Sequence, residues 1–422
     1  MWRAEMFLLF LLLHVFLFPT EISSELEKSR KEFFDAKKCD PNCTFLYDNI
    51  TIQNIDYFPK DCSTVCADIY ITYSSNLTEE KLETTFKNMK HLIGTLDVSQ
   101  TFFVQGNFLA GLESVETDYG NVEFINNWNM NVLDLSNLTS LNCSQFRITQ
   151  NPKMTTIKLP NLKNLTTRET SIIANSSKLE VVISSLNSSY CIKFDEMEHF
   201  LSLDKGDFSA IYANYCTPAV EDKACNKPEQ GCIRFLGDLI IGANFSDFEI
   251  LKSVESLFGR LIISGSNLTS LDFLANLKYI APLGWKSDSI YAIHYENEKS
   301  KAVQIFNNSK LVDYSLPSLK RIRTDSAYPV TIESNNEALQ TNSKACWILQ
   351  KALVSEHVQV DDDFCFNIQA NEDNIQANKE RQDRENQTKM MWIAIGVGCA
   401  AVLIIFVFFC YCCCFKKKRS GK

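Results

Sequence analysis

Histidine, serine and acidic side chains form no catalytic pattern in this 422-residue chain. The four histidines after residue 23 are scattered and lack the spacing of metal ligands: His91, His199, His294 and His357. The sequence has no H-E-x-x-H motif of zinc proteases, no G-x-S-x-G motif of serine hydrolases and no glycine loop that would cradle a phosphate. We therefore expect no enzyme activity, no metal and no cofactor.

The cysteines are the reactive side chains that do form a pattern. Eleven of the sixteen precede the last apolar segment of the chain. In an oxidising compartment such residues pair as disulfides by default, and here they are Cys39, Cys43, Cys62, Cys66, Cys143, Cys191, Cys216, Cys225, Cys232, Cys346 and Cys365. The two C-x3-C pairs among the first four would also suit zinc, but secretion favours disulfides.

An odd number of cysteines leaves one thiol over, and we expect it to be Cys143. Strand alternation would place Leu141 and Cys143 on an inner face and Asn142 on the outer face. A buried free cysteine packs as a small apolar residue. A disulfide between two copies of the chain is the alternative.

Both ends of the chain carry apolar segments that direct it to a membrane. Residues 1–23 have the layout of a secretory signal peptide, with Arg3 before an apolar run too short to span a bilayer. Residues 390–415 carry no charge and are long enough for a transmembrane helix. The basic residues 416–422 follow at once, so we expect a single-pass type I protein of the cell membrane with its N-terminus outside.

Three cysteines at the cytoplasmic edge of this span are candidates for palmitoylation: Cys412, Cys413 and Cys414. The alternative is that they serve as small apolar residues.

Twelve N-x-S/T sequons lie between the two apolar segments, and several of them should carry glycans in a secreted chain. They are Asn42, Asn49, Asn76, Asn137, Asn142, Asn164, Asn175, Asn187, Asn244, Asn267, Asn307 and Asn386. The formal net charge of −9 argues against nucleic acid as a partner and mildly favours basic partners.

A repeat of 24 residues predicts short parallel strands. Met130, Leu133 and Leu135 recur as Met154, Ile157 and Leu159, and a third copy with Leu179 and Val182 is expected at an offset of 25. One strand per repeat is typical of a solenoid, in which equivalent residues stack inside. A leucine-rich repeat ranks second because its compact consensus is missing.

A longer repeat of about 160 residues predicts two homologous domains. Residues 86–96 match residues 251–261, and residues 159–165 match residues 316–322. Each copy should begin with an amphipathic helix, capped by Thr78 in the first and by a capping box from Ser246 to Glu249 in the second.

Cysteines recur in both copies and suggest their pairing. Cys191 should pair with Cys216, Cys346 with Cys365, and Cys225 with Cys232. Cys39, Cys43, Cys62 and Cys66 would pair among themselves in one of three ways.

These patterns divide the chain into eight parts. They are the signal peptide 1–23, an N-terminal lead-in 24–61, domains 62–216 and 225–365 joined by the linker 217–224, a polar stalk 366–389 that is helical or disordered, the transmembrane helix 390–415 and the tail 416–422. The fold is therefore expected to be predominantly β, with two solenoids, capping helices and one transmembrane helix.

The paired domains resemble the receptor L-domains of the insulin and EGF receptors. The coil from Gln150 to Leu162 is the most specific stretch of this resemblance. It implies right-handed parallel β-helices whose broad sheets contact peptide hormones or growth factors. The receptors have a long cysteine-rich region between the two domains and a cytoplasmic kinase, whereas residues 217–224 and 416–422 are short.

The resemblance implies a kinase-lacking binding protein that captures a secreted peptide or growth factor as a decoy or co-receptor. The alternative is an adhesion or assembly protein that binds another receptor ectodomain or a second copy of itself. Outward positions for a ligand face are expected at Asp134, Lys158, Ile183, Asp313 and Ser315.

Overall fold

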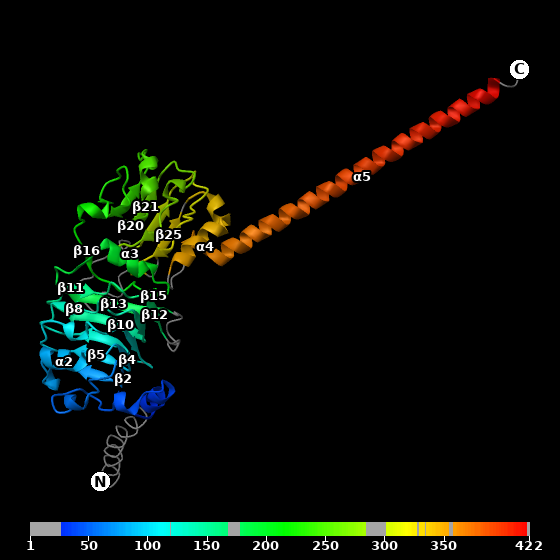
Figure 1. Cartoon of the computed structure of the whole chain (residues 1–422). Coiled ribbons are helices and arrows are strands. Elements are labelled where there is room, and N and C mark those ends of the chain that lie inside the picture. Colours follow the sequence, from blue (N-terminus) through cyan, green and yellow to red (C-terminus); the bar gives the residue numbers. More distant parts are fainter. Residues whose placement is uncertain are drawn as a thin grey trace, which may run out of the picture.

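The computed structural model describes residues 27–118, 120–167, 178–283, 301–326, 329–333, 335–353 and 358–419. The expected signal peptide and the sequon at Asn175 lie outside the described residues. Figure 1 shows a first strand-rich half, a second strand-rich half and one long helix, α5, that extends away from them. We call residues 27–216 the first half and residues 217–364 the second half.

Short strands with apolar residues at every second position build the first half, and all their described pairings are parallel. Sheet A contains, in spatial order, β1 (Thr44–Phe45), β2 (Thr64–Ala67), β4 (His91–Ile93), β6 (Ser114–Glu116), β9 (Ser140–Asn142) and β12 (Asn164–Thr166). Sheet B contains β15 (Gly206–Asp207), β13 (Leu179–Leu186), β10 (Gln145–Asn151), β7 (Val122–Ile125), β5 (Leu96–Ser99) and β3 (Ile69–Ile71). Two smaller sheets pair β8 (Val132–Asp134) with β11 (Thr156–Lys158), and β14 (Cys191–Ile192) with β16 (Asn214–Tyr215).

The second half repeats this arrangement. Sheet E contains β17 (Ala224–Cys225), β18 (Arg234–Leu236), β20 (Ser256–Phe258), β22 (Tyr279–Ile280) and β24 (Arg321–Ile322). Sheet F contains β19 (Leu239–Ile241), β21 (Leu261–Ser264), β23 (Val303–Phe306), β25 (Val330–Glu333), β26 (Gln359–Val360) and β27 (Asp363–Phe364). Only the last pair, β26 with β27, is antiparallel among the described strands.

Helices are few and short except at the C-terminal end. Residues 27–36 are helical, and the α-helices that follow are α2 (Glu79–Phe86), α3 (Phe194–Ser202), α4 (Ser343–Ala352) and α5 (Cys365–Arg419). The 3-10 helices are η1 (Pro41–Cys43), η2 (Ile55–Tyr57), η3 (Tyr73–Ser75), η4 (Asn107–Leu109), η5 (Val220–Asp222), η6 (Phe248–Ser253), η7 (Asp272–Leu274) and η10 (Glu337–Thr341).

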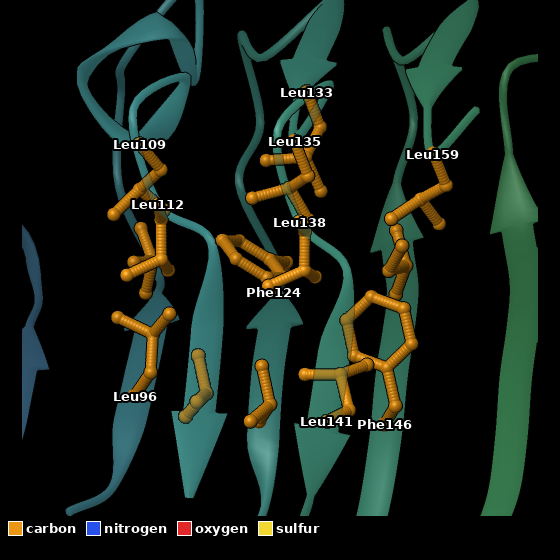
Figure 2. Packing of buried hydrophobic residues seen from close by; sticks show 14 of the residues in the cluster. Leu96, Leu109, Leu112, Phe124, Leu133, Leu135, Leu138, Leu141, Phe146 and Leu159 are labelled. Carbon is orange, nitrogen blue, oxygen red and sulfur yellow. The ribbon is translucent and has the colours of Figure 1, made fainter. Parts of the chain in front are cut away.

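The 24-residue repeat is confirmed by the strand register. Leu133 pairs with Ile157, and Leu141 pairs with Leu165. Figure 2 shows Leu133 and Leu141 among the buried side chains that fill the space between the strands. Burial of such apolar side chains is the main favourable contribution to folding, at about 25 cal/mol per Å².

Buried asparagines connect successive repeats. The Asn127 side chain accepts a hydrogen bond from the backbone N–H of Thr101 and donates one to the carbonyl of Val98, at 3.2 and 2.8 Å. One repeat further on, Asn151 accepts from the backbone N–H of Asn127 at 2.9 Å. Asn308 has the same role in the second half. These side chains satisfy backbone groups that a buried turn would leave without partners.

The third copy of the repeat was wrongly placed. Strand β13 pairs with β10, so that Val181 lies beside Phe146 at an offset of 35 residues instead of 25. This register turns Leu179, Val181 and Ile183 inward, and Ile183 is only 1% exposed. The expected outward position of Ile183 is therefore wrong, since a shift of one residue exchanges the two faces of a strand.

One of the two expected capping helices is confirmed. The Thr78 side chain accepts a hydrogen bond from the backbone N–H of Lys81 at 3.2 Å and begins α2. In the second half the equivalent segment is the 3-10 helix η6, whose N-cap Asp247 makes no side-chain capping bond. The predicted capping box is wrong: the helical segment begins after Asp247 instead of Ser246, the chain is extended at Val254, and β20 begins at Ser256.

The expected N-terminal lead-in at residues 24–61 contributes to the core of the first half. Phe45, Ile50, Ile55 and Phe58 are buried in the core of the first half. Strand β1 also adds to the edge of sheet A by pairing with β2. Residues 44–58 therefore cover the first repeat and belong to the packed structure.

Five disulfides are present in the described residues. The three pairs that the sequence suggested are seen, namely Cys191–Cys216, Cys225–Cys232 and Cys346–Cys365. Of the three pairings left open, the structure has Cys39–Cys66 and Cys43–Cys62. Cys143 is a buried free cysteine, and burial raises the pKa of its thiol to about 12.

Two buried arginines join the halves. Arg323 from the second half donates to the carbonyl oxygens of Phe208 and Ser209, at 3.2 and 2.6 Å, and to that of Ile211. Arg321 donates to the carbonyls of Leu203 and Gly206 at 2.9 and 3.3 Å. Charged donors that satisfy several buried carbonyls fix the two halves against one another.

The stalk and the membrane segment form one helix. Helix α5 runs continuously from Cys365 to Arg419, and Ile368 at its start is buried in the core of the second half. Its apolar part is the one candidate membrane span among the described residues. Residues 366–389 are thus helical, and they connect the folded halves directly to the candidate span (Figure 1).

Candidate binding surface

The residues expected to form a ligand face are not brought together. Lys158 on β11 and Asp134 on β8 make an ion pair of 2.7 Å. Asp313 caps a turn in the second half, where its carboxylate accepts hydrogen bonds from the backbone and hydroxyl of Ser315. Ile183 is in the core. Because the charged residues are already paired with protein groups, this set does not define one site.

The outer face of sheet A is occupied at one end by the N-terminal helix. Phe33 and Phe34 of residues 27–36 are buried against Cys66 and Ile93, which lie on β2 and β4. The contact between Lys37 and Glu116 extends the cover to β6. This end of sheet A is therefore closed by the chain itself.

Two sequons lie at the other end of sheet A. Leu141 on β9 and Leu165 on β12 point into the core, so Asn142 and Asn164 point outward. The two strands are neighbours in the sheet. Glycans are bulky, so occupancy of either site would keep a large partner away from this face.

Sheet B presents a broad outer face. Leu96 and Val98 are buried, which turns Asp97 outward, and the same alternation exposes Glu123 and Arg147. The strand register aligns Tyr70, Asp97, Glu123 and Arg147 in one row across β3, β5, β7 and β10. Of the sequon asparagines that the structure describes, none lies on a strand of this sheet.

The row on sheet B contains two acidic side chains, Asp97 and Glu123, and one basic side chain, Arg147. Arg147 makes an ion pair with Glu123 at 3.2 Å. The Asp97 oxygen Oδ1 is buried and has no hydrogen-bond partner among the described residues. Burial raises the pKa of the Asp97 carboxyl, and the neighbouring Glu123 raises it further. With two acidic side chains and one basic side chain, the row carries a net negative charge, which favours a partner with basic side chains.

The sequence contained a signal for this row that went unnoticed. Asp97, Glu123 and Arg147 each follow an inward apolar residue, and the last two are separated by the 24-residue repeat. Of the residues predicted for the ligand face, Asp134 and Lys158 lie on the small sheet of β8 and β11, and Ile183 lies on β13 of sheet B with its side chain in the core.

The described part of the chain contains no candidate metal site. No group of three or more histidine, cysteine, aspartate or glutamate side chains is placed there to hold an ion. The four N-terminal cysteines, which also suited zinc by spacing, form two disulfides.

Comparison with known families identifies part of the chain. Residues 231–351 match the receptor L domain family. The match extends from the turn before β18 into the last turn of α4, and it lies wholly within the second half. No curated protein matches the chain by sequence.

Proposed function

We propose that this protein is a cell-surface binding protein with two receptor L-domains, each a right-handed parallel β-helix. The second half supports this through its family match. The first half supports it through the same strand order in two parallel sheets and the same buried asparagine contacts. The domains correspond to residues 62–216 and 225–365, with residues 44–58 as an added cap on the first.

A pair of glycines supports the kinship of the two halves. A Cβ on Gly94, whose φ is +134°, would lie 2.1 Å from the carbonyl oxygen of Ala67. A Cβ on Gly259 would lie 2.0 Å from the carbonyl oxygen of Gly237. The two glycines are equivalent in the 160-residue repeat, and both allow adjacent turns to touch.

The proposed location is the cell membrane. Helix α5 supports it because its apolar part is long enough to cross a bilayer. In this proposal residues 1–23 are a cleaved signal peptide, residues 390–415 span the membrane and the N-terminal side is outside. The basic residues from Lys416 face the cytoplasm, and Cys412 to Cys414 beside them are the sites of acylation.

The ectodomain acts by capturing a secreted peptide or growth-factor-like protein, as a decoy or a co-receptor. The outer face of sheet B in the first half is the binding surface. The observation that carries this proposal is the row from Tyr70 to Arg147, in which two acidic side chains accompany one basic side chain and on whose strands no described sequon asparagine lies. The ligand therefore presents basic side chains to this face.

Binding to intact cells tests the proposal. Cells that display the full-length protein are exposed to a panel of purified secreted peptides and growth factors, and bound ligand is measured by flow cytometry. We expect a basic ligand that is retained by the wild type and whose binding is weakened about tenfold by Asp97→Ala, which removes a negative charge from the row. Retention of no member of the panel, or a ligand indifferent to Asp97→Ala, would argue against sheet B as the binding surface.

A further inference from the structure

A second feature of the first half is a hollow at the ends of β3 and β5. Its volume is about 530 Å³, and the residues that decide its character are Tyr73, Asn76, Phe102 and Val104. Tyr73 and Phe102 are 63% and 61% exposed. The hollow is preformed, because the carboxylate of Glu79 accepts hydrogen bonds from the backbone N–H groups of Val104 and Gln105 and holds this wall in place.

The apolar surface continues beyond the hollow. The ring of Trp128 lies 5.0 Å from that of Phe102. The backbone N–H of Trp128 donates to the carbonyl of Thr101, and that of Tyr73 donates to the carbonyl of Gln100, so the three segments are adjacent. Contiguous exposed aromatic surface on a secreted protein is either covered by something or prone to aggregation.

One residue that lines the hollow, Asn76, is a possible attachment site for a glycan. Asn76 begins the sequon Asn76-Leu77-Thr78 and is exposed at the hollow. No hydrogen bond of its side chain is seen within the described residues. The amides of Asn137 and Asn187, by contrast, already donate to backbone carbonyls at 2.7 and 2.9 Å. The Asn76 amide is thus free for modification while its backbone is fixed by the turn.

We propose that Asn76 carries an N-linked glycan whose first sugars lie in this hollow and cover Tyr73 and Phe102. The pyranose ring of N-acetylglucosamine has an apolar face that suits an aromatic ring, and its hydroxyl groups suit the polar rim formed by Thr72 and Glu80. Tethering to Asn76 gives the sugar a high effective concentration, so weak stacking contacts are sufficient to hold it. The hollow is therefore the binding site of the protein's own glycan, and it is separate from the proposed peptide-binding row on sheet B.

Footprinting of the full-length protein tests this inference. Glycopeptide mass spectrometry measures the occupancy of Asn76, and hydroxyl-radical labelling measures the reactivity of Tyr73, Phe102 and Trp128. Asn76→Gln should raise the labelling rate of Tyr73 and Phe102 about threefold or more. The matched control Asn267→Gln removes an exposed sequon of the second half and should leave both rates unchanged.

A second measurement excludes effects on folding. Enzymatic removal of the whole glycan from the folded wild type should expose the same aromatic residues, whereas Tyr57, exposed elsewhere in the first half, should not change. An unoccupied Asn76, or labelling rates that are unchanged both in the variant and after glycan removal, overturns the inference. Protection that survives Asn76→Gln and disappears on dilution would indicate a second copy as the occupant and also overturns it.

Discussion

The junction between the two halves should depend on Arg323 more than on any surface ion pair. Arg323 is 3% exposed, and its guanidinium serves three carbonyl oxygens of the first half and the carbonyl of Pro282. Arg323→Ala leaves these buried acceptors without donors, at about 1 kcal/mol or more each. The expected loss of stability at the junction is therefore about 3–5 kcal/mol. Arg323→Lys should be intermediate, because an ammonium group cannot serve all four oxygens.

Differential scanning calorimetry of the full-length protein in detergent measures this effect. The wild type should melt with the two halves coupled, and Arg323→Ala should separate them into two transitions, the first about 10 °C lower. Arg260→Ala is the matched control, since it breaks only a half-exposed ion pair with Asp238 and should cost at most about 1 kcal/mol. A single unshifted transition for Arg323→Ala would refute the reasoning that the buried arginine holds the junction.

Three further predictions follow from single residues. Gly94→Ala should prevent folding and surface expression, because its Cβ would overlap a backbone carbonyl, whereas Gly111→Ala, with no heavy atom closer than 3.9 Å, should be expressed normally. The Cys143 thiol, with its pKa raised by burial to about 12, should resist maleimide at pH 8 until the protein is unfolded, and its contribution to stability should fall as the pH rises above about 8.5, where the unfolded thiol ionises. Asp97→Ala should raise the melting temperature at pH 7 and change it little at pH 3, because a carboxyl whose pKa is raised by burial and by Glu123 is destabilising once ionised; a lowered melting temperature at pH 7 would contradict this.

The 24-residue repeat and the alternation of apolar and polar residues along the strands made much of the fold predictable. The 24-residue repeat identifies partners such as Leu133 and Ile157, because parallel stacking brings equivalent residues together. The same alternation placed Cys143 in the core. Periodicity failed where the chain inserts residues, as between β12 and β13, since an insertion in a loop changes the offset without changing the pattern of the strand.

The candidate site was less predictable than the fold. The row of Asp97 with Tyr70 and Glu123 depends on the register of three strands, which brings together residues from separate repeats. The junction was equally hidden, because Arg323 in the sequence resembles any exposed basic residue, and only the folded chain brings the carbonyls around it. Such contacts join segments more than 100 residues apart and have no local pattern.

A glycan placed on sheet B tests the central claim most directly. Arg147→Asn creates a new sequon with Thr149 in the middle of the row, and Arg147→Gln removes the same charge without a sequon. Binding of the identified ligand to cells should be lost with Arg147→Asn, once glycosylation is verified, and should change less than about tenfold with Arg147→Gln. Full binding to the glycosylated Arg147→Asn protein would contradict the account, because a partner cannot occupy a face that a glycan covers.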